Sequence, residues 1–551
     1  MEERRLLIAV VLSIAILLGT QYAMRKLYPP QPAPEAKPVA AKPAPPPLPP
    51  PAPAPMDNVK TAGTRRTVVI ENALYRAAVD TQGGVLRSFR LKKFMSKSHE
   101  PLELVPQKIP PQGLPYLALE VPGSPSLTQR LSNAVYELRV GNLPAQQSSF
   151  MPPIELLFAY SDGGIAVEKK MAFEPNLYAI EVSGRLWIAG QPRALAVSVG
   201  PDIGTEAGEP ETDFEVREVI VSHGGRVERS GFAKGKNHNY SEPVDWAGFD
   251  TKYFAVLGVS AEAFPSLRMQ RFDIRQGGGL FVPYYQIFYP LGAKPVRFFL
   301  GPKDYELLNG VAPGLSSVID YGWFALLVKP LIFSLKLIHQ YVQNWGFAII
   351  LLTLIISLAL FPVRYKQMVS MKKMQAIQPQ MRSIQDRYKK YKRTDPKRQE
   401  MNAEIMNLYK QNGINPLGGC LPLLIQMPFL FAFNSMLAST IELRGAPFIL
   451  WIRDLSRMDP YYVTPVLMGV TMYLQQRMTP QTTTDPAQAR MMNMMPFIFV
   501  FMFFKFPSGL VIYFLFSNLF GMALQKAAEK WMPVPAPSPK PGRRGGKTDK
   551  E

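Results

Sequence analysis

Five apolar stretches beyond residue 345 constrain the fold of this chain more than any other feature. Each is near the short end of the roughly 17–25 residues that a helix needs to cross a bilayer, and none carries Asp, Glu, Lys, Arg or His near its middle. Spans this short imply a locally thinned bilayer or a wet interior. We therefore expect membrane-spanning helices at about 346–363, 417–437, 461–477, 491–507 and 509–526.

The N-terminal segment has the pattern of a sixth span. MEERR precedes the apolar run LLIAVVLSIAILLGTQY, and no clear A-x-A cleavage site follows. This pattern favours an uncleaved signal anchor at 1–24 over a cleaved signal peptide, with the N-terminus in the cytoplasm because Arg4 and Arg5 precede the run. Residues 25–57 are rich in Pro and Ala, a composition that extends as polyproline II, so we expect them to form a linker.

Residues 58–315 have the pattern of a strand-rich domain. Short alternating runs such as TVVIENALYRAAVD and YAIEVSGRLWI are separated by glycine turns, which predicts a large, all-β sandwich. Its acidic residues could supply a carboxylate pair for sugar chemistry. Because no spacing signature supports that hypothesis, we interpret them as solvated strand and loop residues: Asp80, Glu155, Glu206, Glu209 and Asp213.

Residues 318–342 are strongly apolar but carry two lysines, Lys329 and Lys336. The lysines are seven residues apart and therefore lie on one face of a helix, which favours an amphipathic helix in the membrane interface. The alternative is a true span whose lysines extend to the headgroups.

Basic residues between 364 and 410 determine the expected orientation, and the formal net charge is +20. By the positive-inside rule this segment is cytoplasmic. The basic tail at 531–551 and the N-terminus then lie on the same side, and the β-sandwich is periplasmic. In a chain with long apolar runs, such a charge indicates cytoplasmic loops and anionic lipids rather than nucleic acid.

The same basic segment predicts a cytoplasmic helical hairpin at 365–413. Its apolar residues recur every three or four positions, Pro379 marks a kink, and Asn412-Gly413 ends the second helix. The methionines form either the hairpin's own seam or a surface that accepts apolar client segments. The residues expected to make client contacts are Met371, Lys372, Lys373, Met374 and Met381.

Several function classes are disfavoured. Ion-coupled transporters and charge-lined channels usually carry ionisable groups inside the membrane, and these spans carry none near their middles. GxxxxGK[ST], HExxH and GxSxG are absent, and Cys420 is the only cysteine, so we expect no nucleotide-driven pump, intramembrane hydrolase, disulfide or Cys-rich metal site. We predict a protein that is not an enzyme and needs no cofactor or metal.

Neutral polar residues recur within the spans instead. They can bond to their own helix carbonyls, join neighbouring helices or line a wet groove. The pattern, on short spans interrupted by prolines, favours a polar groove. Its candidate residues are Thr353, Ser357, Gln426, Asn434, Thr464, Thr471, Tyr513, Ser517 and Asn518.

Three motifs resemble the YidC-type membrane protein insertases of Gram-negative bacteria: Asn415-PLGGCLPLLIQMPFLFAF, Asp459-PYYVTPVLMGVTMYLQQRMTP and Phe506-PSGLVIYFLFSN. The resemblance implies a five-helix core within 345–530 around a groove that is open to the cytosol and the lipid, in a multi-pass protein of the bacterial inner membrane. It also implies insertion and folding of nascent inner-membrane proteins, alone or with the Sec translocon. The ribosome and membrane lipids are further expected partners, and nucleic acid is not.

The chain departs from this family pattern at one groove position. Ser357 stands where the family usually has arginine, Thr353 is kept, and Phe514 replaces a second tyrosine. Arg364 is about two turns further toward the cytosol and is no obvious substitute.

We expect client apolar segments to slide along Met427, Leu430 and Met502. Two other classes remain open. One is a folding and assembly chaperone without insertion activity, and the other is a lipid or glycan enzyme that uses the sandwich as a carbohydrate module.

Overall fold

The computed structural model describes residues 64–96, 99–141, 143–144, 147–204, 217–231, 237–275, 281–391, 395–413, 421–478 and 486–531. The expected anchor, linker and C-terminal tail lie outside these residues, except for Trp531. The description below concerns the unit Asn58–Glu551, to which all described residues belong.

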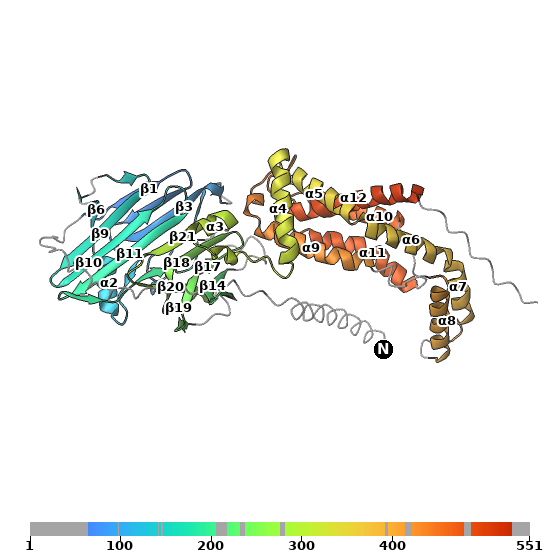
Figure 1. Ribbon diagram of the computed structural model, residues 1–551, viewed down its shortest axis with the longest axis horizontal. Helices are drawn as coiled ribbons and strands as arrows, with labels where there is room; N and C mark the ends of the chain where they lie inside the picture. The colour runs from blue at the N-terminus through green and yellow to red at the C-terminus, as the bar shows by residue number, and fades with distance from the viewer. Residues whose placement is uncertain are drawn as a thin grey trace, which may run out of the picture. The chain divides into compact units, whose positions relative to one another are not determined.

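The first part of this unit is rich in strands (Figure 1). The strands are β1 (Thr67–Glu71), β2 (Tyr75–Asp80), β3 (Val85–Met95), β4 (Pro101–Glu103), β5 (Leu119–Glu120), β6 (Glu137–Val140), β7 (Leu143–Pro144), β8 (Ser149–Phe150), β9 (Ile154–Asp162), β10 (Ile165–Phe173), β11 (Ala179–Ile188), β12 (Gln191–Arg193), β13 (Leu195–Val199), β14 (Glu218–His223), β15 (Arg226–Gly231), β16 (His238–Tyr240), β17 (Val244–Asp250), β18 (Phe254–Phe264), β19 (Leu267–Arg275), β20 (Phe281–Leu291) and β21 (Val296–Pro302).

These strands form three sheets. The largest has the order β15-β14-β17-β18-β21-β11-β10-β9-β6-β7, with β12 paired to β11. The other two have the orders β4-β3-β2-β1-β8 and β16-β19-β20-β13-β5. Pairing is antiparallel throughout the described strands except between β1 and β8. The predicted antiparallel sheet is therefore confirmed.

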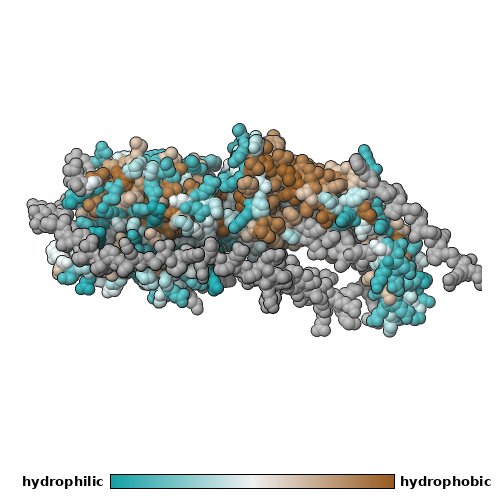
Figure 2. All heavy atoms as spheres, viewed as in Figure 1, coloured by the Kyte–Doolittle hydropathy of each residue, from teal (hydrophilic) through white to brown (hydrophobic). Residues whose placement is uncertain are grey.

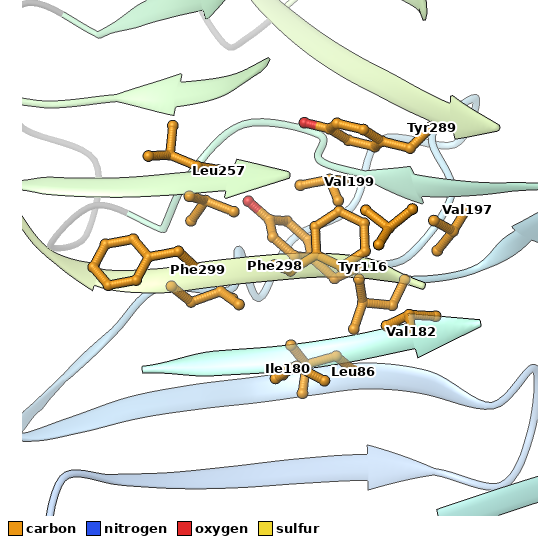
Figure 3. Packing of buried hydrophobic residues seen from close by; sticks show 14 of the residues in the cluster. Leu86, Tyr116, Ile180, Val182, Val197, Val199, Leu257, Tyr289, Phe298 and Phe299 are labelled. Atoms are coloured by element: carbon orange, nitrogen blue, oxygen red, sulfur yellow. The ribbon is translucent and has the colours of Figure 1, made fainter. Parts of the chain in front are cut away.

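One hydrophobic core joins the three sheets. Leu86 of β3, Val182 of β11 and Val197 of β13 are all buried in the same cluster, with Tyr289 and Phe298 beside them. Figure 3 shows these side chains directed toward one another between the strands. Alternation along each strand explains this, because every second residue points to the same face.

The domain also contains two helices, so the all-β prediction is wrong in that detail. They are α2 (Pro125–Asn133) and α3 (Tyr305–Val311), and a 3-10 turn, η1 (Leu315–Val318), follows the second. Leu308 and Val311 of α3 are buried in the core of the sheets. Asp304 caps α3 by accepting hydrogen bonds from the backbone N–H groups of Glu306 and Leu307.

Two acidic residues of the sugar-chemistry hypothesis have clear partners. Asp80 is only 1% exposed and forms an ion pair of 2.7 Å with Arg65, so interpreting it as a solvated residue is wrong. Glu155 is exposed and pairs with Lys170 at 2.9 Å. The other three lie outside the described residues.

The described residues after η1 form mainly helices. The helices are α4 (Ala325–Val342), α5 (Trp345–Ala359), α6 (Phe361–Ala376), α7 (Gln378–Arg387), α8 (Lys397–Gln411), α9 (Leu421–Ser439), η3 (Ile441–Leu443), α10 (Val463–Met478), α11 (Pro486–Phe503) and α12 (Ser508–Trp531). Figure 2 shows apolar residues gathered on the visible face of the bundle that contains α4, α5, α10 and α12, whereas hydrophilic residues cover α7 and α8.

Two of the described helices are long and apolar enough to cross a membrane, Ala325–Val342 and Ser508–Lys530. The pair Trp345–Ala359 and Phe361–Ala376 adds a third if it forms one span, although its axes differ by 57°. The bend falls beside Pro362, which has no N–H with which to continue the hydrogen bonds of α5. The count of six spans and the interfacial assignment of α4 stay predictions.

The hairpin has the predicted stop signals. α6 ends at Ala376, just before Pro379, and α8 ends at Gln411 with Asn412 as its C-cap and Gly413 at a φ of +61°. Its small core contains Met374, Ile377 and Met381, packed against Ile405, Leu408 and Tyr409 of α8.

Candidate functional site

The helical bundle has α12 near its centre. α12 packs most extensively on α10 and α5, α4 packs on α5 and α9, and α11 packs on α10. Gly469 of α10 permits the last contact, because a Cβ there would lie 2.1 Å from Cγ2 of Val500. The predicted groove residues lie on α5, α9, α10 and α12.

The two hydroxyls of α5 that were predicted to line a groove are buried inside the bundle. Thr353 is 1% and Ser357 is 2% exposed. The Thr353 hydroxyl donates a hydrogen bond of 2.6 Å to the carbonyl oxygen of Ile349 in its own helix. Thr353 therefore makes the bond to its own helix, which was one of the alternatives open from the sequence. The hydroxyl oxygen of Thr353 can still accept a second hydrogen bond.

Polar groups also meet between α10 and α12. Asn518 donates from Nδ2 to the Thr471 hydroxyl at 3.4 Å, and Thr471 donates to the carbonyl of Met468 at 2.8 Å. Ser517 is also buried, and further along α12 Gln525 donates to the carbonyl of Met478 at 3.1 Å. A polar row therefore follows this helix pair toward the end of the bundle where α6 begins.

An aromatic cluster joins α9, α11 and α12. Tyr513 of α12 stacks on Phe433 of α9 with ring centroids 4.0 Å apart. Phe503 of α11 contacts Phe514 of α12 and Phe506 at 4.9 Å each. These rings join α9, α11 and α12 where the polar row ends, and such packing leaves little room for water.

Beyond the aromatic cluster, the connection between α9 and α10 is fastened to the N-terminal ends of α5 and α12. Asn344 donates from Nδ2 to the carbonyl of Phe448 at 3.2 Å. The Ser508 backbone N–H and hydroxyl both donate to the carbonyl of Arg457, at 2.7 and 2.8 Å. The connection therefore covers this end of the bundle.

Asp459 is the most heavily bonded residue of this connection. Its Oδ2 accepts from the Thr464 N–H and hydroxyl, at 2.8 Å each, and its Oδ1 accepts from Trp451 Nε1 and the Tyr461 N–H, at 3.0 Å each. Burial by itself raises the pKa of Asp459, but these hydrogen bonds, chiefly those from Thr464, outweigh it and lower the pKa below its ordinary value.

The predicted slide residues are more exposed than the groove residues. Met427 and Met502 are 38% and 44% exposed, and Leu430 and Asn434 are half-buried. Exposed apolar side chains continue along α11 at Phe497, Ile498 and Phe501. The backbone of Gln426 belongs to α9, but its side chain lies outside what the structure describes.

The predicted hairpin contacts separate into two groups. Met374 and Met381 pack in the hairpin seam, and Met371 is also buried. Lys372 is half-buried and Lys373 is exposed. Seam packing, the first of the two interpretations, therefore accounts for Met374 and Met381 in this structure.

Sequence reasoning missed several features of the bundle. The role of Asp459 could have been anticipated, because a short acidic residue just before a helix satisfies free N–H groups. The Phe433–Tyr513 stack had no such signal. Among the described residues, no group of three or more His, Cys, Asp or Glu side chains could hold a metal ion.

A bundle of apolar helices joined to a strand-rich domain is the architecture of a membrane-integral protein with a water-soluble domain. Residues 337–535 match the family described as "60Kd inner membrane protein", and residues 67–334 match the family described as "YidC periplasmic domain".

Two relatives identify the family over the whole length. A "Membrane protein insertase YidC" of Geotalea daltonii is 35% identical, covering 97% of this chain and 100% of the relative. Its counterpart in Syntrophus aciditrophicus is 35% identical over 95% of this chain and 98% of the relative. The chain belongs to the YidC family of membrane protein insertases, as its three motifs predicted.

The chain also matches a solved structure described as "Active YidC insertase crystal structure with the first transmembrane domain resolved". The two share 20% identity over 84% of this chain and 93% of the solved chain, with a TM-score of 0.37. The family assignment rests on the sequence matches.

Proposed function

We propose that this protein inserts membrane proteins into the bacterial inner membrane and assists their folding, alone or with the Sec translocon. The observation that carries the proposal is the division of the bundle into two halves. One half has the polar row around Thr471 and Asn518, and the other has the aromatic cluster around Phe433 and Tyr513. A client's polar tail would enter the polar half from the cytosol.

The polar row lowers the cost of bringing a polar tail into the membrane. An unsatisfied amide or hydroxyl costs several kcal/mol in hydrocarbon. Hydroxyl and amide groups from α5, α10 and α12 would bond the tail transiently, with Thr353 and Ser357 on the floor of the groove. Because such bonds exchange with water, they contribute little net energy and release the tail easily.

Apolar burial supplies the driving force. The client's apolar segment would leave water along the exposed side chains of α9 and α11, including Met427, Leu430 and Met502. Each Å² of apolar surface removed from water gains about 25 cal/mol, so no nucleotide hydrolysis is required. The aromatic cluster and the connection held by Asp459 would keep the groove closed on the periplasmic side.

The basic hairpin completes the proposed orientation. α7 and the turn that follows it carry exposed basic residues, including Arg382 in α7 and Lys389 and Lys390 in the turn. By the positive-inside rule they lie in the cytoplasm, where they would meet anionic lipids and the ribosome. The strand-rich domain then lies in the periplasm.

The test is to reconstitute the full chain into liposomes without the Sec translocon and to follow protease protection of a one-span client. We expect protection that depends on the protein. If none appears while an established family member works in parallel, the insertase proposal is wrong and the chaperone alternative replaces it.

A pair of variants tests the groove hydroxyls. Thr353→Ala combined with Ser357→Ala should slow insertion. Thr440→Ala is a matched control, because Thr440 is equally buried and its hydroxyl donates a bond of the same length, 2.6 Å, to the Met436 carbonyl. Equal rates in the double variant and the parent would exclude a role of these hydroxyls in insertion.

A further inference from the structure

A turn in the connection between α9 and α10 holds a large apolar side chain in an exposed position. The backbone N–H of Phe448 donates to the carbonyl of Ile452 at 2.9 Å, and the N–H of Ile452 donates to the carbonyl of Ile449 at 3.1 Å. Leu450 lies at the tip of this turn, is 79% exposed and has a φ of +54°. A residue other than glycine adopts a positive φ only where the surrounding structure enforces it. The exposure of Leu450 is therefore built into the turn.

Two tyrosines continue this exposed surface to the start of α10. Tyr461 and Tyr462 are both exposed, and Tyr462 also has a positive φ, +56°. The ring of Tyr461 contacts that of Trp451 with centroids 6.2 Å apart. The ring of Tyr462 contacts that of Phe504 at 4.9 Å. Tyrosine is suited to a boundary between apolar and wet surroundings, because its ring is apolar and its hydroxyl is polar.

An aliphatic stripe runs from Tyr462 along α10. Val466, Val470 and Leu474 follow Tyr462 at intervals of four residues, and all three are exposed. Residues four apart lie on one face of a helix, and this stripe extends over roughly 18 Å. Met468, on another face, is buried in the bundle. In a chain that matches an inner membrane protein family, an exposed aliphatic face of this kind contacts lipid hydrocarbon.

Two basic residues accompany the aromatic rings. Arg453 is exposed in the same connection, and Lys505 is exposed directly after Phe504. The acidic residues between 450 and 462 are engaged, Asp454 by Arg457 at 3.3 Å and Asp459 by the hydrogen bonds described above. The surface therefore changes from aliphatic on α10 to aromatic and basic at the connection. A bilayer changes in the same order, from hydrocarbon to the interface and the lipid phosphates.

We propose that the connection between α9 and α10 binds phospholipids of the adjacent leaflet, with Leu450 and Tyr461 inserted between the headgroups and Arg453 bound to a lipid phosphate. In the proposed orientation this is the periplasmic leaflet. A guanidinium binds phosphate through paired, charge-assisted hydrogen bonds. Its positive charge favours anionic over zwitterionic phospholipids. The inference does not depend on insertion activity, because it requires only that the bundle lies in a bilayer.

Lipid bound at the connection would fix the depth of several helices together. Asn344, the N-cap of α5, donates to the carbonyl of Phe448, and Ser508 of α12 donates to the carbonyl of Arg457. The connection is thus fastened to two helices and continuous with α10. Aromatic and basic residues at the interface oppose movement along the membrane normal, so the bundle keeps its level while clients enter and leave.

The first experiment measures the depth of the turn with the full-length protein in nanodiscs. In a Cys420→Ser background, which removes the only cysteine, Leu450→Cys carries an NBD fluorophore. Met151→Cys is the matched control, because Met151 of the strand-rich domain is also 79% exposed. Lipids with a nitroxide near the top of an acyl chain should quench NBD at position 450 strongly and at position 151 weakly, and aqueous iodide should show the reverse order.

Equal behaviour of the two positions would place the turn in water and overturn the inference. The alternative occupant of this surface is an apolar client segment. Quenching by iodide but not by lipid, with an NBD emission change only when a client is added, would assign the surface to clients and also overturn the inference.

The second experiment tests the guanidinium in nanodiscs that contain equal amounts of phosphatidylglycerol and phosphatidylcholine. Nitroxide-labelled phosphatidylglycerol should quench NBD at position 450 more than nitroxide-labelled phosphatidylcholine. Arg453→Gln should reduce this preference by about twofold to fivefold. Arg193→Gln makes the same chemical change at an exposed position of β12 and should leave the preference unchanged. An unchanged preference in Arg453→Gln would exclude the phosphate contact.

Discussion

Replacing Asp459 with alanine tests whether the connection between α9 and α10 holds the first turn of α10 in place. The change removes the acceptor of four hydrogen bonds, two from Thr464 and one each from Trp451 and Tyr461. Losing an acceptor for the first N–H groups of a helix costs about 0.5–2 kcal/mol. A buried N–H left without a partner, here that of the indole, adds about 1–3 kcal/mol.

Because these losses are not additive, we expect a total of about 2–4 kcal/mol in the free energy of local opening. Hydrogen exchange of the Thr464 and Tyr461 amides measures that opening, and exchange should accelerate by roughly 30-fold to 900-fold. Asp454→Ala is the matched control in the same connection, since Asp454 has no bond to the described residues of α10: it accepts from Ser456, at 2.9 Å from its N–H and 2.7 Å from its hydroxyl, and pairs with Arg457 at 3.3 Å. Equal acceleration in the two variants would refute the reasoning.

The pH dependence of stability gives an independent check on the hydrogen bonds that Asp459 accepts. Its pKa is lowered in the folded protein, so its contribution to stability is fully present above the ordinary carboxyl pKa of about 3.9. The contribution is lost as the pH falls through the lowered folded value. In Asp459→Asn, an amide nitrogen replaces one of the two carboxylate oxygens. We expect a loss of stability smaller than that of Asp459→Ala, and this loss should not change over this pH range.

Three further predictions concern packing and charge. Gly469→Ala should force α10 away from Val500 and destabilise the helical bundle by about 1–3 kcal/mol, measured as a lower midpoint of thermal unfolding by circular dichroism; an unchanged midpoint would contradict the close contact. Lys336→Gln breaks an ion pair with Glu442 of 2.5 Å; because both groups are partly exposed, we expect a loss of at most about 1 kcal/mol that high salt abolishes, and a salt-independent loss would indicate another cause. Burial lowers the pKa of Lys169 well below its ordinary value. Between the lowered pKa and about 10.5, the unfolded chain therefore binds more protons than the folded chain. The free energy of unfolding should rise with pH over this range. Urea unfolding of the strand-rich domain between pH 7 and 9.5 measures this rise, and Lys169→Met should reduce it.

Part of the fold could be predicted because it depends on local rules. Period-two alternation predicted antiparallel strands, since side chains on a strand alternate between its faces. Pro379 and Asn412-Gly413 predicted the ends of the hairpin helices, because proline lacks a donor and glycine accepts a positive φ. The family could be recognised because three motifs in the apolar segments resemble those of the family.

Lys169 and Asp80 show where local rules fail. Lys169 occupies an inward-facing position in the alternating pattern of its strand. Nothing in the sequence predicts that its amine would donate to the carbonyls of Gly84 and Leu117. Asp80 has the appearance of a solvated strand residue but is buried against Arg65. In both cases the partners are far away in the sequence, so only the folded chain brings them together.

The sequence by itself determined the apolar segments, the strand-rich domain, the basic hairpin and the set of polar residues within the apolar segments, because hydropathy and local propensity act over a few neighbouring residues. Only the tertiary structure decided how those polar residues are used. It directed the Thr353 hydroxyl to its own helix and joined Thr471 to Asn518 across two helices. The physical reason is that hydrogen bonds and close packing depend on distances of a few Å between helices, which sequence spacing does not specify.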